Sequence, residues 1–185
     1  MSLDLLGGAH APGFDDPLGM LRACHRRIEK QLATLERLQR HLPEHGHDDD
    51  ARHAARAILR YFDTAAVNHH ADEERSIFPR LARAAVTDAH AQAVMNELQR
   101  EHRLLDVQWA RLRPLLAGIA AGQRANLSPR DVLELREAYA RHIAVEEDVL
   151  IPIAEATLDD QALLEIGEEM ASRRDVDRAR ERVGS

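Results

Sequence analysis

The chain has 185 residues, of which 44% are hydrophobic, 31% charged and 3% aromatic, and its net charge is -7. This composition predicts one folded domain and excludes a disordered chain, and no apolar run reaches the ~20 residues of a membrane span. The negative charge and the few aromatic side chains argue against nucleic-acid binding. Cys24 is the only cysteine, which excludes an internal disulfide. Since 1–14 also lacks an apolar leader, we expect a cytoplasmic protein.

The first predicted helix begins at Asp16, a typical N-cap residue, with Pro17 at the first helical position. Apolar residues and one histidine then recur at steps of three and four, as on the buried side of a helix. These residues are Leu18, Leu21, His25, Ile28, Leu32, Leu35 and Leu42. We expect this helix to end near Pro43 and a second one to begin at Ala51. The inward residues of the second are Ile58, Phe62, Ala65, His69, Glu73 and Ile77. Pro79 is expected to kink or end it, because proline removes a helical hydrogen bond.

Two more long helices and a short one follow. Thr87 is expected to cap the third, which ends near Gly122. Its inward residues are Val94, Leu98, His102, Leu105, Trp109, Leu112, Leu116 and Ile119. Ser128 and Asp131 resemble a capping box that opens the fourth helix. Its inward residues are Val132, Leu135, Tyr139, His142, Glu146, Val149 and Ile153. A short fifth helix is expected from about Asp160 to 172, followed by a charged tail that frays.

Long helices joined by short connections predict an all-α fold, an antiparallel up-down-up-down four-helix bundle with a short fifth C-terminal helix. The expected organisation is a flexible N-terminal segment over 1–15, the bundle over 16–156, and the C-terminal helix and tail over 157–185.

Each long helix carries one histidine at an inward position, and two helices add a glutamate one turn later on the same side. Both H-x-x-x-E-E segments, 69–74 and 142–147, precede a proline that lies six positions after the first glutamate, which indicates a duplicated helical hairpin. The helical rise places each histidine roughly 12–15 Å or slightly more from the same end of the bundle. We therefore expect six side chains to meet at one level of the interior. They are His25, His69, Glu73, His102, His142 and Glu146.

The meeting of these ionisable groups favours a metal site over a purely structural polar layer, because burial costs several kcal/mol for each group that neither pairs nor binds metal. Four imidazoles and two bridging glutamates supply about eight bonds, too many for one tetrahedral zinc. The donor types favour two iron ions joined by a solvent-derived oxygen, with manganese next and zinc third.

The doubled H-x-x-x-E-E signature, with one histidine on each of the other two helices, resembles the hemerythrin-like, or HHE cation-binding, domain over about 16–156. The resemblance implies a four-helix bundle with an oxo- or hydroxo-bridged di-iron centre whose bridging ligands are both glutamates. The implied ligands are His25, His69, Glu73, His102, His142 and Glu146. Oxygen-carrying hemerythrins have a second histidine at the position of Asp106 and an aspartate, at a longer spacing, in place of Glu146. The chain resembles bacterial HHE proteins more than those oxygen carriers.

The sequence leaves undecided whether His70 and Asp106 are additional metal ligands. His70 repeats the histidine–glutamate spacing with Glu74 about 100° further round the helix, so it either binds metal or pairs with Glu74 at the surface. Asp106 and Glu29 each lie four residues after an inward histidine and could bind metal or contact a ligand, although flank charge is the simpler interpretation for Glu29.

A di-iron site with a free coordination position predicts a protein that binds or senses a small ligand, such as oxygen, nitric oxide or peroxide, or that acts in an iron or redox stress response. No nucleic-acid or membrane partner is expected. The alternatives are a di-iron oxidase or peroxidase, which would need a substrate-sized pocket beside the metals, and a module that stores iron or uses it structurally.

Overall fold

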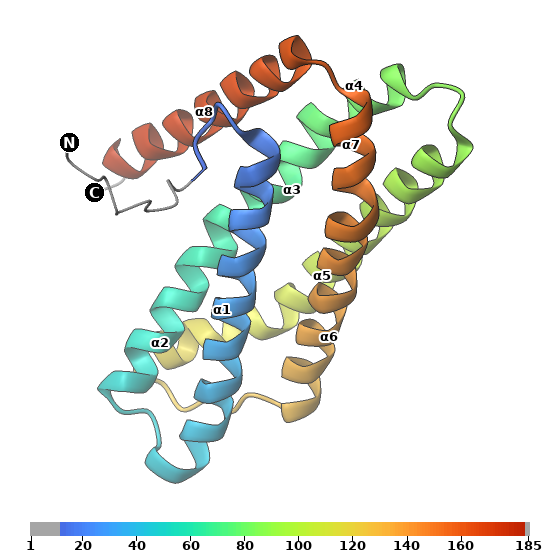
Figure 1. Ribbon diagram of the computed structural model, residues 1–185. Coiled ribbons are helices and arrows are strands. Elements are labelled where there is room, and N and C mark those ends of the chain that lie inside the picture. Colours follow the sequence, from blue (N-terminus) through green and yellow to red (C-terminus); the bar gives the residue numbers. More distant parts are fainter. Residues whose placement is uncertain (1–11, 184–185) are drawn as a thin grey trace, which may run out of the picture.

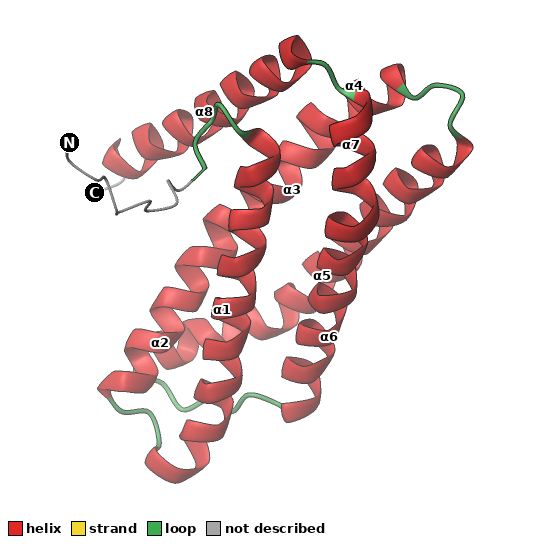
Figure 2. Ribbon diagram, viewed as in Figure 1, coloured by secondary structure: helices red, strands yellow, loops and turns green. Residues whose placement is uncertain are grey.

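The computed structural model describes residues 12–183, with side chains through Asp175, and every regular element among these residues is helical. Four long rods run alternately in opposite directions, and a fifth helix crosses one end of the bundle (Figures 1 and 2). The predicted up-down-up-down four-helix bundle is therefore confirmed. Of the N-terminal segment expected over 1–15, residues 1–11 lie outside the described part.

The first rod is helix α1, Pro17–His45. Its start is the predicted one, since the carboxylate of Asp16 accepts a hydrogen bond of 2.8 Å from the backbone N–H of Gly19. Its end lies beyond Pro43, which falls in the last turn and therefore does not interrupt the helix body. Gly46, at a φ of 72°, turns the chain away.

The second rod is continuous from Asp49 to Ala84 and contains two π turns. It consists of α2 (Asp49–Arg60), the π turn η1 (Tyr61–Ala65), α3 (Ala66–Asp72), the π turn η2 (Glu73–Ile77) and α4 (Phe78–Ala84). The carboxylate of Asp48 caps it by accepting from the N–H of Ala51. Pro79 distorts this rod rather than ending it, because the preceding N–H, that of Phe78, bonds five residues back to the carbonyl of Glu73.

The third rod is α5, Ala89–Ala120. Asp88 caps it rather than the expected Thr87, because the carboxylate of Asp88 accepts from two backbone N–H groups of the first turn. The fourth rod consists of α6 (Pro129–Val145), the π turn η3 (Glu146–Leu150) and α7 (Ile151–Thr157). Ser128 caps it as predicted.

Helix α8, Asp160–Val183, continues past residue 172, where the shorter expected helix ends. It lies across the end of the bundle at which α1 begins, and it packs on α1, α3 and η2 (Figure 1). Ile166 and Met170 bury its apolar side there. Among the described residues, no helix is long and apolar enough to cross a membrane.

The apolar core consists of two separate clusters. One surrounds Leu35, Leu112 and Leu116, and the other contains Leu21 and Met170. On every rod, the inward histidine or glutamate lies between a residue of one cluster and a residue of the other, as His102 lies between Leu98 and Leu105. A polar layer therefore divides the bundle core across its middle.

Candidate metal centre

The polar layer contains all six side chains that the spacing predicts to meet, and each is buried. They come from every rod: His25 from α1, His69 from α3, Glu73 from η2, His102 from α5, His142 from α6 and Glu146 from η3. Both glutamates are the first residue of a π turn. Such turns change the direction of the side chains that follow, and they occur often at functional sites.

The potential ligand atoms of these six side chains form two overlapping groups, and the atoms of each group lie within 4.8 Å of one another. The first group is His25, His69, Glu73 and Glu146, and the second is Glu73, His102, His142 and Glu146. The two glutamates belong to both groups. This arrangement fits two neighbouring cations bridged by two carboxylates.

Several buried atoms of the layer lack a hydrogen-bond partner. The Nε2 of His25 lies 2.9 Å from an oxygen of Glu146, and the Nε2 of His102 lies 3.2 Å from an oxygen of Glu73. Despite these short distances, none of the four carboxylate oxygens of Glu73 and Glu146 accepts a hydrogen bond of normal geometry. Buried polar atoms without partners are costly, and cations between them would remove that cost. Nitrogen and oxygen donors of this kind fit iron.

Charge is concentrated in the layer. Burial and the nearby Glu146 raise the pKa of Glu73. Burial acts in the same direction on Glu146, but the imidazoles around it, first of all His142, outweigh burial and hold its pKa well below the usual range. Burial also opposes the charged form of His102, yet Glu146 and Glu73 raise its pKa to about 10. Glu146 and His102 thus favour each other's charged form against the effect of burial, and cation binding by such side chains would release protons.

Three of the four histidines are oriented by a glutamate that lies outside the set of six side chains. In each, the Nδ1–H donates to a glutamate, which directs the Nε2 toward the centre of the layer, where its lone pair would face a cation once the ring is neutral. The pairs are His25–Glu147 at 2.8 Å, His102–Glu74 at 2.7 Å and His142–Glu101 at 2.8 Å. Sequence reasoning missed this role, although two of these glutamates are the second glutamate of the repeated H-x-x-x-E-E segments.

His70 lies at the site and Asp106 does not. Ligand atoms of His70, His102 and His142 form a third group within 4.8 Å. The Nε2 of His70 is buried without a partner, and burial together with the charge of His102 lowers the pKa of His70 well below its usual value. Glu74 instead bonds to His102, and the Nε2 of His70 makes no hydrogen bond to Glu74 or to any other described residue. Asp106 is exposed, like Glu29, and belongs to none of these groups.

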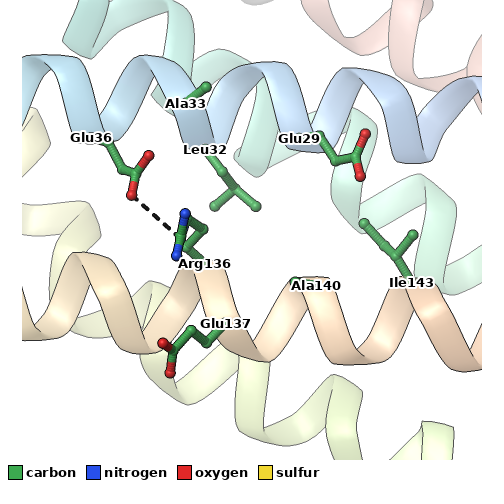
Figure 3. Close-up of a pocket in the computed structure, with 8 residues that line it drawn as sticks. All are labelled: Glu29, Leu32, Ala33, Glu36, Arg136, Glu137, Ala140 and Ile143. Atoms are coloured by element: carbon green, nitrogen blue, oxygen red, sulfur yellow. Dashed lines mark ion pairs between the residues drawn. The ribbon is translucent and has the colours of Figure 1, made fainter.

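A shallow hollow of about 350 Å³ lies between α1 and α6 (Figure 3). Its floor is apolar, with Leu32 and Ile143, and an ion pair of 3.3 Å joins Glu36 to Arg136 across it. None of the residues that line it belongs to the metal-ligand groups.

Comparison with known proteins agrees with this geometry. Residues 16–154 match the hemerythrin HHE cation-binding domain. An uncharacterised protein of Haemophilus influenzae is 32% identical over 163 residues, which are 88% of this chain and 92% of the relative. The family match covers the four rods except for the last three residues of α7, and it includes every residue of the polar layer. The chain therefore belongs to the hemerythrin HHE cation-binding domain family.

Proposed function

We propose that this cation-binding protein holds two iron ions in the polar layer and binds a small ligand, such as oxygen, nitric oxide or peroxide, at the pair. One observation carries the proposal: Glu73 and Glu146 belong to both groups of ligand atoms. Two carboxylates shared in this way would bridge two ions. A site for a single ion would not need six inward ligands from four helices.

The two ions would have unequal protein ligands. The ion beside His25 and His69 would have four, including both glutamates. The ion beside His102 and His142 would have five, because His70 reaches the same pair of imidazoles. Six-coordinate iron therefore has more room for a small ligand on the side of His25 and His69. Iron there would supply reversible redox chemistry and a binding position for a diatomic molecule or peroxide.

The surroundings favour binding of a small, weakly polar molecule. An apolar core cluster lies on each side of the layer and limits access of water. The imidazole rings are fixed by the three outer glutamates, Glu74, Glu101 and Glu147, so the open position would keep its shape when the ligand leaves. We further propose a role in an iron or redox stress response in the cytoplasm. Cys24 is a free thiol, which fits a reducing compartment where disulfides are rare.

Iron quantitation with an optical spectrum tests the proposal. The protein is purified without oxygen and loaded with ferrous iron, and iron per chain is measured before and after addition of oxygen, nitric oxide or azide. Two irons per chain, with an absorption change on ligand addition, are expected. One zinc or no metal after reconstitution would overturn the di-iron site. Two irons without a response to any ligand would indicate a structural or stored metal.

A further inference from the structure

A buried carboxylate, that of Asp72, lies beside the π turn η2 and belongs to none of the metal-ligand groups. Asp72 directly precedes the ligand Glu73, and its side chain is completely buried. Successive helical residues point about 100° apart. Glu73 therefore points to the polar layer, whereas Asp72 points to α8, where its partners lie.

Two arginines of α8 hold Asp72. The guanidinium of Arg174 donates to both carboxylate oxygens, at 3.2 and 2.7 Å, and Arg173 donates to one of them. Arg173 also donates to the hydroxyl of Ser76 at 2.8 Å, and that hydroxyl donates to Glu169 of α8 at 2.6 Å. Helix α8 thus contacts both the residue before the π turn and a residue inside it.

The second half of the chain lacks this attachment. In the repeated segment, Val145 stands at the position of Asp72 and Val149 at the position of Ser76. The ligand Glu146 and the π turn that follows are otherwise equivalent. Polar residues therefore occur at these two positions only in the half against which α8 packs.

We propose that Asp72 and Arg174 are positioning residues through which docking of α8 and metal binding by Glu73 are coupled. The inference rests on the proposed function. A π turn lacks the regular hydrogen bonds of an α-helix, so its ligand is held by what contacts the turn on both sides. Metal holds Glu73 from the interior, and α8 holds Asp72 and Ser76 from the exterior. Coupling is reciprocal, so bound metal stabilises the docked α8 to the same extent that docked α8 favours metal.

The test compares wild type with Arg174→Met and with a matched control, Glu165→Gln. Glu165 pairs with Arg80, so the control removes an ion pair between α8 and α4 but leaves Asp72 paired. Ferrous iron is titrated anaerobically into each full-length protein, and amide hydrogen exchange of 160–175 is measured with and without iron. We expect at least a tenfold weaker affinity for Arg174→Met, the loss expected when the support of a ligand is removed. We expect wild-type affinity for Glu165→Gln.

Iron should slow exchange of α8 in wild type and in the control but not in Arg174→Met. Arg174→Lys should recover part of the affinity, because lysine keeps the charge without the bidentate contact. Where Arg174→Met fails to fold, Asp72→Asn serves instead, since it removes the buried charge. The proposal would be overturned by equal iron affinity in all variants, or by amide exchange of α8 in wild type that is the same with and without iron. A wild-type protein that binds no iron would instead refute the proposed function.

Discussion

Glu73 and Glu146 occupy equivalent places in the two halves of the molecule, each as the first residue of a π turn and each six residues before a proline. In both turns, the N–H of the residue before the proline bonds to the carbonyl of the glutamate itself. Proline cannot donate a backbone hydrogen bond, and the wider turn accommodates this loss without ending the helix. The repeated spacing thus combines a proposed ligand with the backbone turn that presents it.

Because the two glutamates belong to both ligand groups, their loss should differ from the loss of a histidine. Glu73→Gln and Glu146→Gln are each expected to reduce metal content from two ions per chain to nearly none. His25→Ala should retain the ion on the side of His102. Metal analysis after reconstitution and desalting measures the difference. Loss of a single ion in both glutamate variants would contradict the bridging assignment.

His70 and Asp106 provide a second comparison. His70→Ala should weaken binding of the ion beside His102 and His142 by at least about tenfold, since that ion loses one of three imidazoles. Asp106→Asn should leave both affinities unchanged, because Asp106 is exposed and outside the ligand groups. Competitive titration against a chelator measures both values. A larger effect at Asp106 than at His70 would reverse the assignment.

The outer carboxylates should tune affinity without changing the number of ions bound. Glu101→Gln removes the charge that accepts from the Nδ1–H of His142, and a loss of about 10–100-fold in affinity is expected. Glu97→Gln is the control, because Glu97 lies one turn earlier on α5, is exposed and pairs with Arg100. Competitive titration against a chelator measures the metal affinity of both variants. Equal effects of the two substitutions would show that general surface charge, and not the contact with His142, controls affinity.

The level of the site was predictable from sequence, whereas its details were not. Helical rise and antiparallel topology suffice to bring His25, His69, His102 and His142 to one height, and the structure places them together. The π turns were not predictable, because a regular period of 3.6 residues gives no sign of where a helix widens. The turn η1 illustrates the consequence: Ala66 is buried where the regular period predicts Ala65.

The outer glutamates escaped prediction for a related reason. Glu74 and Glu147 follow the inward glutamates by one residue, and a position 100° away looks like an ordinary charged flank. Their partners, His102 and His25, come from other rods. Only the packing of the rods decides which flank faces a neighbouring histidine, and the helical period of one segment does not give that packing.

The stability of the apolar cluster around Leu35, Leu112 and Leu116 should be independent of metal binding in the polar layer. Leu35 is completely buried, and it lies ten residues, or roughly 15 Å, along α1 from His25. Leu35→Ala is expected to lower the free energy of unfolding by about 2–5 kcal/mol, because it leaves a cavity, without changing metal content. Denaturant titration measures the free energy of unfolding. Leu133→Ala is the control: Leu133 is exposed, so its free energy of unfolding should change by no more than about 0.5 kcal/mol. A loss of bound metal in Leu35→Ala would show that this cluster and the polar layer are coupled.

Acid should weaken the attachment of α8 through Glu169. The hydrogen bond from Arg80, more than the opposing burial, lowers the pKa of Glu169, and the Ser76 hydroxyl and the charge of Arg173 act in the same direction. A carboxyl whose pKa is lower in the folded state contributes stability above its unfolded pKa, near 4.3. That contribution is lost as the pH falls through the folded value. The contact should therefore contribute fully at neutral pH and disappear in acid.

Glu169→Gln tests this prediction. At pH 7 the variant should have a lower free energy of unfolding than wild type, and the difference should shrink as the pH falls below the unfolded pKa of glutamate. The difference should be small, because Glu169 is partly exposed. Glu168→Gln, at the exposed neighbouring position, should follow wild type at every pH. Denaturant titrations of the metal-free proteins between pH 7 and pH 3 give the comparison. A difference between Glu169→Gln and wild type that persists or grows in acid would show that the ionised carboxylate is not the source of the contact's stability.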